Sequence, residues 1–250
     1  MEELDPRRYL IRYRGTQVDF FRFPGNYGDS LIWHGTKELL RSCEIQTRDV
    51  SIESPRNSRL LIDGGGNLVD YYSDVRDFLM KKSLSYDEII ILPHTINGEE
   101  QIAALNRIRG RLVVFCREQT SAQYVKQRLR RGEIYLWHDC AFYNNFSISS
   151  TGNGVLNAFR TDCESVIGKC PTDNVDLSCN GWATKPLKEL IDCLMQFQDI
   201  NTDRLHIAIC GVLLKKNVRL FANSYYKNRA VYDYSLKRFP NIRFAEHPNG

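Results

Sequence analysis

The chain has 250 residues, of which 42% are hydrophobic and 26% are charged, and its formal net charge is +4. This mildly basic balance suits an anionic small substrate or an anionic surface, and falls short of the concentrated basic charge of a nucleic-acid-binding protein. No apolar run reaches membrane length, so we expect a soluble protein with room for one large or two modest α/β domains.

The N-terminus and the cysteines indicate the compartment. The first ten residues are charged and lack an apolar signal segment, which predicts a cytoplasmic protein. The eight cysteines are scattered, without a CxxC pair or a Cys/His spacing typical of zinc. We therefore expect reduced thiols and no metal site.

The first predicted strand runs from Val18 to Phe23 and ends in the turn PGNYGDS. Apolar residues at helical spacing follow from Leu31 to Leu40, and Asp29 or Ser30 can cap this helix. A strand, a glycine-containing turn with Asn26, and a helix N-terminus form the usual binding corner of a doubly wound sheet.

A second strand is predicted from Arg59 to Ile62, followed by DGGGN. Three consecutive glycines are unfavourable in a regular element, so Gly64 to Gly66 are predicted to form a tight loop. Together with Asn67, this is either an ordinary turn or a place where a ligand approaches the backbone closely. The pattern matches neither a dinucleotide-binding loop nor a P-loop.

Three further strands end in polar residues, and they are predicted at Glu88 to Leu92, Leu112 to Cys116 and Ile134 to Trp137. Pro93 cannot continue a ladder, so His94 is predicted at the C-terminal edge of the first of these strands. Arg117 falls at the same edge after the second. The basic run from Lys126 to Arg131 is predicted to be the solvated face of a helix.

The stretch from Asn144 to Gly154 is rich in Ser, Gly and Asn and is predicted to be an interdomain linker. A strand from Val155 to Phe159 follows, with Arg160 and Glu164 at its end. An amphipathic helix is predicted from Leu187 to Leu194.

The next segment carries most of the predicted chemistry. Leu205 to Leu214 is apolar on every side, which predicts a buried helix. Thr202 or Asp203 can cap it, so Arg204 and His206 are predicted in its first turn. A helix N-terminus with a guanidinium and an imidazole would bind an anion. The alternative is a structural ion pair at the arginine and a hydrogen-bonded core histidine.

After that helix, Val218 to Ala222 predicts a strand, and Asn223 and Ser224 open a further helix that carries Lys227. Tyr232 to Phe239 predicts the last helix.

Eight motifs occur in one order: NYGD, GGGN, PHTI, CREQTS, HDCAF, FRTDCE, TDRLH and NSYYKN. Together they resemble the polysaccharide pyruvyltransferase family. The resemblance implies an α/β fold of two Rossmann-like domains facing across a cleft, similar to GT-B glycosyltransferases. It implies an acceptor-side domain at residues 1–146 and a phosphoenolpyruvate-side domain at residues 155–250.

The resemblance also implies transfer of pyruvate from phosphoenolpyruvate to a sugar of a cell-surface polysaccharide or its lipid-linked precursor. The Arg-Leu-His element of the family matches Arg204, Leu205 and His206, and Arg160 is the best match for a further anion-binding arginine. Two positions depart from the family pattern, and they are Ile207 and His94.

We expect Arg204 and Arg160 to hold the donor, and His206 to donate a proton to its methylene carbon. The group that takes the hydroxyl protons is left open among Asp29, Glu164 and His94. The full set of predicted substrate-binding residues is Asn26, Asp29, Gly65, Gly66, Asn67, His94, Arg117, Glu164, Leu205 and Lys227. No metal and no cofactor besides the donor is expected.

Two other functions fit the same layout, a glycosyltransferase that uses a nucleotide sugar and an inactive carbohydrate-binding relative. The expected partners are phosphoenolpyruvate and a saccharide, with no nucleic acid. An acceptor linked to polyprenyl diphosphate would bring the protein to the inner face of the plasma membrane. Basic residues near the N-terminus could contribute to that contact, namely Arg7, Arg8, Arg12 and Arg14.

Overall fold

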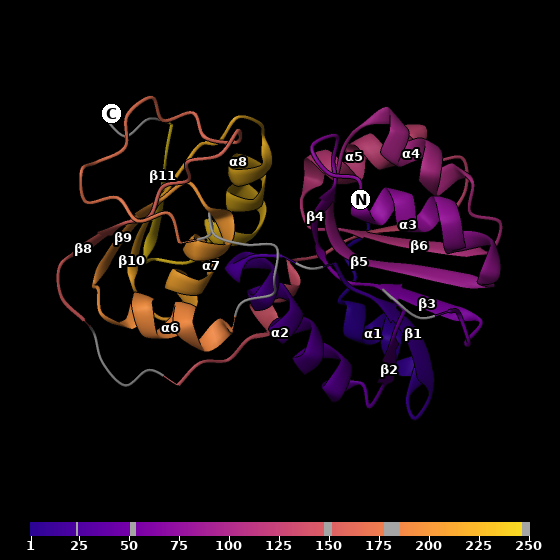
Figure 1. Cartoon of the computed structure of the whole chain (residues 1–250). Coiled ribbons are helices and arrows are strands. Elements are labelled where there is room, and N and C mark those ends of the chain that lie inside the picture. Colours follow the sequence, from indigo (N-terminus) through magenta and orange to yellow (C-terminus); the bar gives the residue numbers. More distant parts are fainter. Residues whose placement is uncertain (24, 51–53, 148–151, 178–185, 247–250) are drawn as a thin grey trace. The chain divides into compact units, whose positions relative to one another are not determined.

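The computed structural model of the chain describes residues 1–23, 25–50, 54–147, 152–177 and 186–246 (Figure 1). The chain forms two compact units. Unit 1 comprises Met1–Phe23 and Gly35–Tyr143, and unit 2 comprises Pro24–His34 and Asn144–Gly250. The short segment that precedes residue 35 thus belongs with the C-terminal half of the chain.

Unit 1 is built on a parallel sheet with strand order β2-β1-β3-β5-β6-β7. Strand β3 pairs with the N-terminal part of β5, and β4 pairs with its C-terminal part. The strands are β1 (Gln17–Phe21), β2 (Gln46–Asp49), β3 (Arg59–Ile62), β4 (Gly65–Leu68), β5 (Glu88–Ile96), β6 (Arg111–Cys116) and β7 (Glu133–Leu136). Every residue of β5 is buried, as its continuous apolar run predicts.

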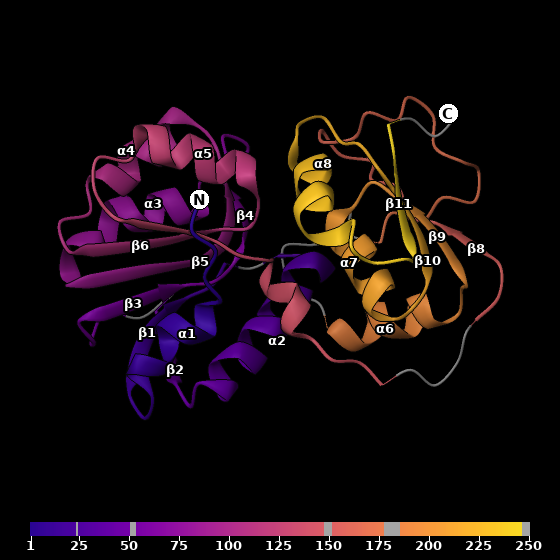
Figure 2. The same ribbon diagram turned by 180° about the vertical axis from the view of Figure 1, so that it is seen from behind.

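The helices of unit 1 lie on both faces of this sheet. Figures 1 and 2 show α3, α4 and α5 on one face and α1 on the other. The helices are α1 (Pro6–Leu10), α2 (Tyr27–Ser42), α3 (Asp74–Lys82), α4 (Glu99–Asn106) and α5 (Gln119–Arg128), and α2 begins in the segment assigned to unit 2. Short 3₁₀ turns are η1 (Ile11–Tyr13), η2 (Ser83–Ser85) and η3 (Cys140–Tyr143).

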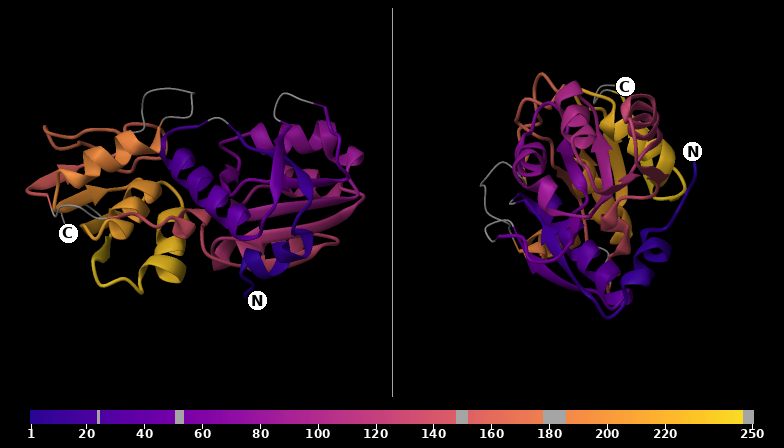
Figure 3. Two further views of the ribbon diagram at one scale, coloured as in Figure 1. Left: turned by 90° about the horizontal axis from the view of Figure 1, so that it is seen from below. Right: turned by 90° about the vertical axis from the view of Figure 1, so that its right-hand side faces the viewer.

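Unit 2 has a smaller parallel sheet with strand order β11-β10-β9-β8. Figures 2 and 3 show these strands, in orange to yellow, as one layer with helices packed against it. The strands are β8 (Val155–Asn157), β9 (Asp199–Thr202), β10 (Asn217–Phe221) and β11 (Ile242–Ala245). The helices are α6 (Leu187–Met195), α7 (Leu205–Leu213) and α8 (Lys227–Val231), which continues as a π-helix, η4 (Tyr232–Leu236).

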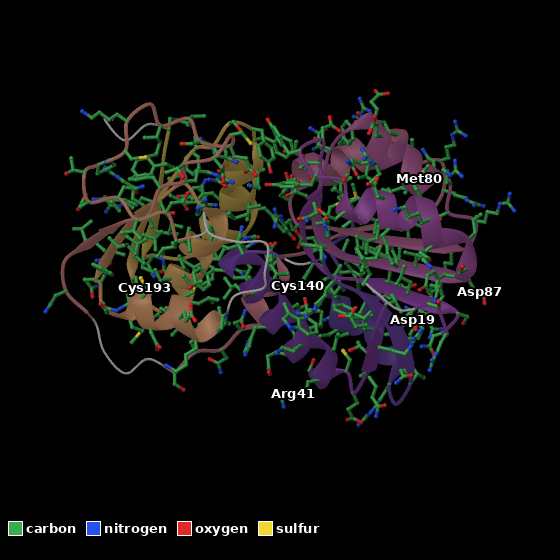
Figure 4. All side chains as sticks on the ribbon, viewed as in Figure 1. Asp19, Arg41, Met80, Asp87, Cys140 and Cys193 are labelled. Atoms are coloured by element: carbon green, nitrogen blue, oxygen red, sulfur yellow. The ribbon has the colours of Figure 1, made fainter. Side chains whose placement is uncertain are left out.

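Apolar side chains fill the space between each sheet and its helices (Figure 4). Two buried carboxylates on strands of unit 1 serve the fold. Asp19, labelled in Figure 4, accepts hydrogen bonds from Asn57 and Tyr86 at 2.6 and 3.1 Å. Glu88 accepts from Tyr13 and Arg59 at 2.7 and 2.6 Å. Because both are paired, neither is available for chemistry.

The predicted α/β class with parallel sheets is confirmed, and two local predictions are wrong. Gly65 and Gly66 lie in strand β4 rather than in a loop, because β4 pairs with the far end of β5 at Gly65 and Leu68. Strand β5 does not stop at Pro93. Its register with β6 shifts between Ile91 and His94, so the residue without an N–H falls in the irregular part of the ladder and pairing resumes.

Several elements have no clear sequence pattern and were not predicted, namely α1, β2, α3, α4, β9 and β11. The predicted last helix is the π-helical segment η4. Part of the predicted linker, residues 148–151, lies outside the described residues. The seven described cysteines are all free thiols. No helix within the described ranges is long and apolar enough to cross a bilayer.

Candidate functional site

The residues Arg204 and His206 lie at the start of α7 in unit 2. Strand β9 ends at Thr202, whose hydroxyl donates to the Ala158 carbonyl at 2.7 Å and accepts the Arg204 N–H at 3.0 Å. Because β9 extends through residue 202, Arg204 is the N-cap residue of α7 rather than a residue of its first turn. His206 is the second helical residue and is half-buried. The helix is buried on nearly every side, as predicted.

Two buried arginines lie next to each other here, each held by carboxylates. Arg160 donates to Asp162 at 2.7 and 2.9 Å and to Glu164 at 2.7 Å. Arg204 donates to Asp176 at 2.6 and 2.8 Å and to Asp162 at 3.2 Å. The two arginines come together because β8 and β9 are parallel neighbours, so their C-terminal ends meet. For Arg204, the structural ion pair considered as the alternative is present.

A third cation, Lys227, joins the cluster from α8. Its Nζ donates to Glu164 Oε2 at 2.5 Å and lies 4.9 Å from the centre of the Tyr225 ring. Asn223 donates to the same carboxylate oxygen at 3.2 Å. Glu164 is only 1% exposed, and it links the segments that carry Arg160, Asn223 and Lys227 by accepting a hydrogen bond from each.

The carboxylates of the cluster differ in their ionisation. Burial alone would raise the pKa of Asp162, but hydrogen bonding and charge from Arg160, with the charge of Arg204, lower it to about 2. Burial raises the pKa of Asp203 to about 6, although the Arg160 N–H donates to its Oδ1 at 2.8 Å. Asp162 is thus ionised throughout the physiological range, whereas burial makes Asp203 easier to protonate than an exposed carboxylate.

The turn NYGD caps helix α2 and approaches His206. The Asn26 side chain accepts the Gly28 N–H at 2.8 Å, and the Asn26 N–H donates to Asp29 at 2.8 Å. This reciprocal pair makes Asn26 the capping residue, in place of the predicted Asp29 or Ser30. A methyl group at Gly28 would lie 2.7 Å from Nδ1 of His206, so glycine is needed for this close approach.

In unit 1, the glycines of β4 approach Arg117. This arginine is fully buried and donates to Thr95 Oγ1 at 2.8 Å and to Asp139 Oδ2 at 2.7 Å. A methyl group at Gly66 would lie 3.0 Å from its Nη2 atom. Asn67 follows on the same strand and is half-buried.

His94 is the most unusual side chain of unit 1. It is fully buried on β5, and neither ring nitrogen has a hydrogen-bond partner in the described residues. Its Nε2 would lie 3.6 Å from a methyl group at Gly65. Burial and the nearby Arg117 guanidinium lower the pKa of His94 to about 3, so the ring is neutral at physiological pH.

The predicted residues therefore fall into two groups. Unit 2 holds Asn26, Asp29, Arg160, Glu164, Arg204, Leu205, His206 and Lys227, and unit 1 holds Gly65, Gly66, Asn67, His94 and Arg117. Two carboxylates of the unit 2 cluster, Asp162 and Asp176, are not among the predicted site residues. Asp162 stands inside the FRTD motif, which was a usable signal, whereas Asp176 lies in an irregular segment without one. Within the described residues, no three metal-binding side chains are grouped to hold an ion.

A basic patch lies elsewhere on unit 1, and we define it as Arg107, Arg109, Lys126, Arg128, Arg130 and Arg131. All six are exposed, and in the described part of the chain none forms an ion pair with a carboxylate. Asn106 links the two segments, donating to the Arg128 carbonyl at 3.2 Å and accepting the Arg130 N–H at 2.8 Å. A hollow of about 410 Å³ opens between them. Because α5 ends at Arg128, the patch is more than the predicted helix face.

Comparison with known proteins places the chain in a family. A family model described as polysaccharide pyruvyl transferase matches residues 26–225. The protein EpsO of Bacillus subtilis (strain 168), named as a proposed pyruvyl transferase, is 22% identical, with 89% of this chain and 86% of EpsO covered. The crystal structure of a functionally uncharacterized protein from Klebsiella pneumoniae subsp. pneumoniae NTUH-K2044 is similar with a TM-score of 0.81 and 31% identity, covering 96% of both chains. The chain belongs to the polysaccharide pyruvyl transferase family.

Proposed function

We propose that this protein transfers pyruvate from phosphoenolpyruvate to a sugar of a cell-surface polysaccharide or of its lipid-linked precursor. Family membership supports pyruvate transfer to a polysaccharide. The observation that carries the choice of donor is the cation cluster of unit 2. Phosphoenolpyruvate bears a carboxylate and a phosphate on a small frame, and Arg160, Arg204 and Lys227 are the groups that recognise such anions.

The proposed chemistry begins at His206. Protonated His206 donates to the methylene carbon C3 of the donor, which makes C2 electrophilic. The first sugar hydroxyl adds to C2, and its proton passes to the now neutral imidazole. Cleavage of the bond between C2 and the phosphate oxygen releases phosphate, and a second hydroxyl adds to C2 to close the ketal. The second hydroxyl proton leaves with phosphate, so one donor and one diol give one ketal and one phosphate.

The carboxylates considered as bases are already engaged. Asp29 accepts the Asn26 N–H in the cap of α2, and Glu164 accepts three donors in the cation cluster. We therefore assign the first hydroxyl proton to His206 itself, which is deprotonated at that stage. Residues 155–250 form the proposed donor side, and the scheme uses no cofactor besides the donor.

We assign acceptor binding to residues 1–146. Asn67 and the backbone of Gly65 and Gly66 offer planar hydrogen-bonding groups of the kind that read sugar hydroxyls. For a lipid-linked acceptor, we propose that the basic patch contacts anionic lipid at the inner face of the plasma membrane. A facing, GT-B-like arrangement of the two units is part of this proposal.

The test is phosphate release from phosphoenolpyruvate with a panel of sugar acceptors. We expect acceptor-dependent release by wild type, and a loss of about 10² to 10⁴-fold in His206→Ala. Gly28→Ala should lose activity as well, because its methyl group would displace the His206 ring. The matched control is His34→Gln, which alters a half-buried histidine that contacts Asn144 instead.

The same panel separates the two other functions. Turnover of a nucleotide sugar in place of phosphoenolpyruvate would favour the glycosyltransferase. Binding of saccharide with turnover of neither donor would favour the inactive relative. Full activity of His206→Ala would contradict the proposed acid.

A further inference from the structure

One carboxylate of the cation cluster bridges both arginines. Oδ2 of Asp162 accepts from Nη2 of Arg160 at 2.9 Å and from Nη2 of Arg204 at 3.2 Å. Two guanidinium groups thus converge on a single carboxylate oxygen. This is the geometry with which a pair of arginines binds one anionic group of a ligand.

Asp162 differs from the other acidic partners in its exposure. The side chains of Glu164 and Asp176 are 2% and 4% exposed, and each holds one arginine from the protein interior. The Asp162 side chain is 44% exposed. The buried partners therefore fix the arginines in place, while Asp162 sits on their solvent side.

The solvent-side position of Asp162 matters because of the charge balance of the cluster. The three cations form ion pairs with three carboxylates, Asp162, Glu164 and Asp176, and a fourth carboxylate, Asp203, accepts the backbone N–H of Arg160. With Asp162 in place, the cluster has no positive charge in excess of these carboxylates for an anionic donor. Withdrawal of Asp162 would remove one negative charge from the cluster and release the three guanidinium hydrogen bonds that it accepts, two from Arg160 and one from Arg204. Since its pKa is about 2, a drop in pH within the physiological range would not release it.

We propose that Asp162 is an internal anion that occupies the donor site and must leave it when the donor binds. The inference rests on the proposed use of phosphoenolpyruvate. The carboxylate or phosphate of the donor takes over both guanidinium groups, and the exposed Asp162 side chain turns to solvent. Asp162 thereby sets donor affinity: any ligand with fewer or weaker anionic groups cannot displace it.

The experiment is calorimetric titration of phosphoenolpyruvate into wild type and Asp162→Asn. The amide keeps an oxygen that can accept the Glu164 N–H, now donated to Asp162 at 3.1 Å, so the loop should be retained. If the open arrangement is populated about a tenth of the time in wild type, removing the internal anion tightens binding roughly tenfold. Asp162→Glu keeps the charge and should stay closer to wild type. Circular dichroism and thermal melting verify the fold of each variant.

Asp176→Asn is the matched control, since it removes the same charge from the same cluster but loosens Arg204. We expect this variant to bind phosphoenolpyruvate no better than wild type. Equal tightening in both variants would show a net-charge effect and overturn the inference, as would unchanged or weaker binding by folded Asp162→Asn. If neither wild type nor Asp162→Asn bound phosphoenolpyruvate, the proposed function would fail and this inference with it.

Discussion

At the scale of single residues, His94 combines complete burial with two ring nitrogens that have no hydrogen-bond partner in the described chain. An unpaired buried polar group costs free energy, and a charged one costs more. The fold accommodates His94 in its neutral form beside Gly65 and Arg117. Burial and the charge of Arg117 lower the pKa of His94 from 6.5 to about 3. Acid should therefore weaken unit 1 through this residue.

The first prediction concerns this pH dependence. Below pH 6.5 the unfolded chain binds a proton at His94 that the folded chain refuses until about pH 3, so stability is lost as pH falls through this window. Between these limits the free energy of unfolding of wild type should fall by up to about 1.4 kcal/mol per pH unit more than that of His94→Gln. Urea denaturation at a series of pH values measures both slopes. Equal slopes would mean that His94 binds its proton equally well in the folded protein.

At the scale of elements, β5 organises unit 1, because it pairs with β3, β4 and β6. The loop that precedes β6 packs closely against the residues that precede β5. A methyl group at Gly110 would lie 2.4 Å from the carbonyl oxygen of Asp87 and 2.7 Å from that of Tyr86. Backbone atoms cannot rotate away as side chains do. Glycine at position 110 therefore allows the segments that precede β5 and β6 to pack together.

The second prediction is that Gly110→Ala lowers the free energy of unfolding by about 1–3 kcal/mol, as other overpacking substitutions do. The matched control is Gly168→Ala, since nothing lies within 4 Å of a methyl group at that exposed position. The control should stay within about 0.5 kcal/mol of wild type. Chemical denaturation of the three proteins measures the difference, and equal stability of both variants would contradict the crowding argument.

At the scale of the whole molecule, the positive charge is unevenly distributed. The formal net charge is +4, yet the basic patch alone holds six cations without carboxylate partners in the described chain. The patch lies on the last turn of α5 and on the loops that precede β6 and β7, at the ends of the strands opposite to His94 and Arg117. Anionic lipid attracts basic residues near its surface by about 1 kcal/mol each.

The third prediction is that the protein sediments with vesicles that contain phosphatidylglycerol and not with phosphatidylcholine alone. Added salt should weaken this binding, because it screens exposed charges. A double variant, Arg107→Glu with Arg130→Glu, should abolish it. The control is Arg219→Glu with Arg243→Glu, which reverses two exposed charges of unit 2. Equal loss in both double variants would show that net charge, not the patch, controls membrane contact.

The sequence by itself determined the α/β class, the buried strands and the buried helix α7, because these depend on local apolar patterns. It also determined the family, through the order of eight short motifs along the chain. Arg160 and Arg204 could be expected to meet, since each follows a strand of one parallel sheet. The continuation of β5 past Pro93 and the strand pairing of Gly65 were decided by the neighbouring strands.

Only the tertiary structure decided the electrostatics of the candidate site. Asp176 pairs with Arg204 across 28 residues of sequence, from a segment without a regular pattern. The burial of His94 and the approach of Gly28 to His206 likewise depend on contacts between distant segments. Local patterns report which face of an element is apolar, and they carry no information about which charged groups the folded chain brings within hydrogen-bonding distance.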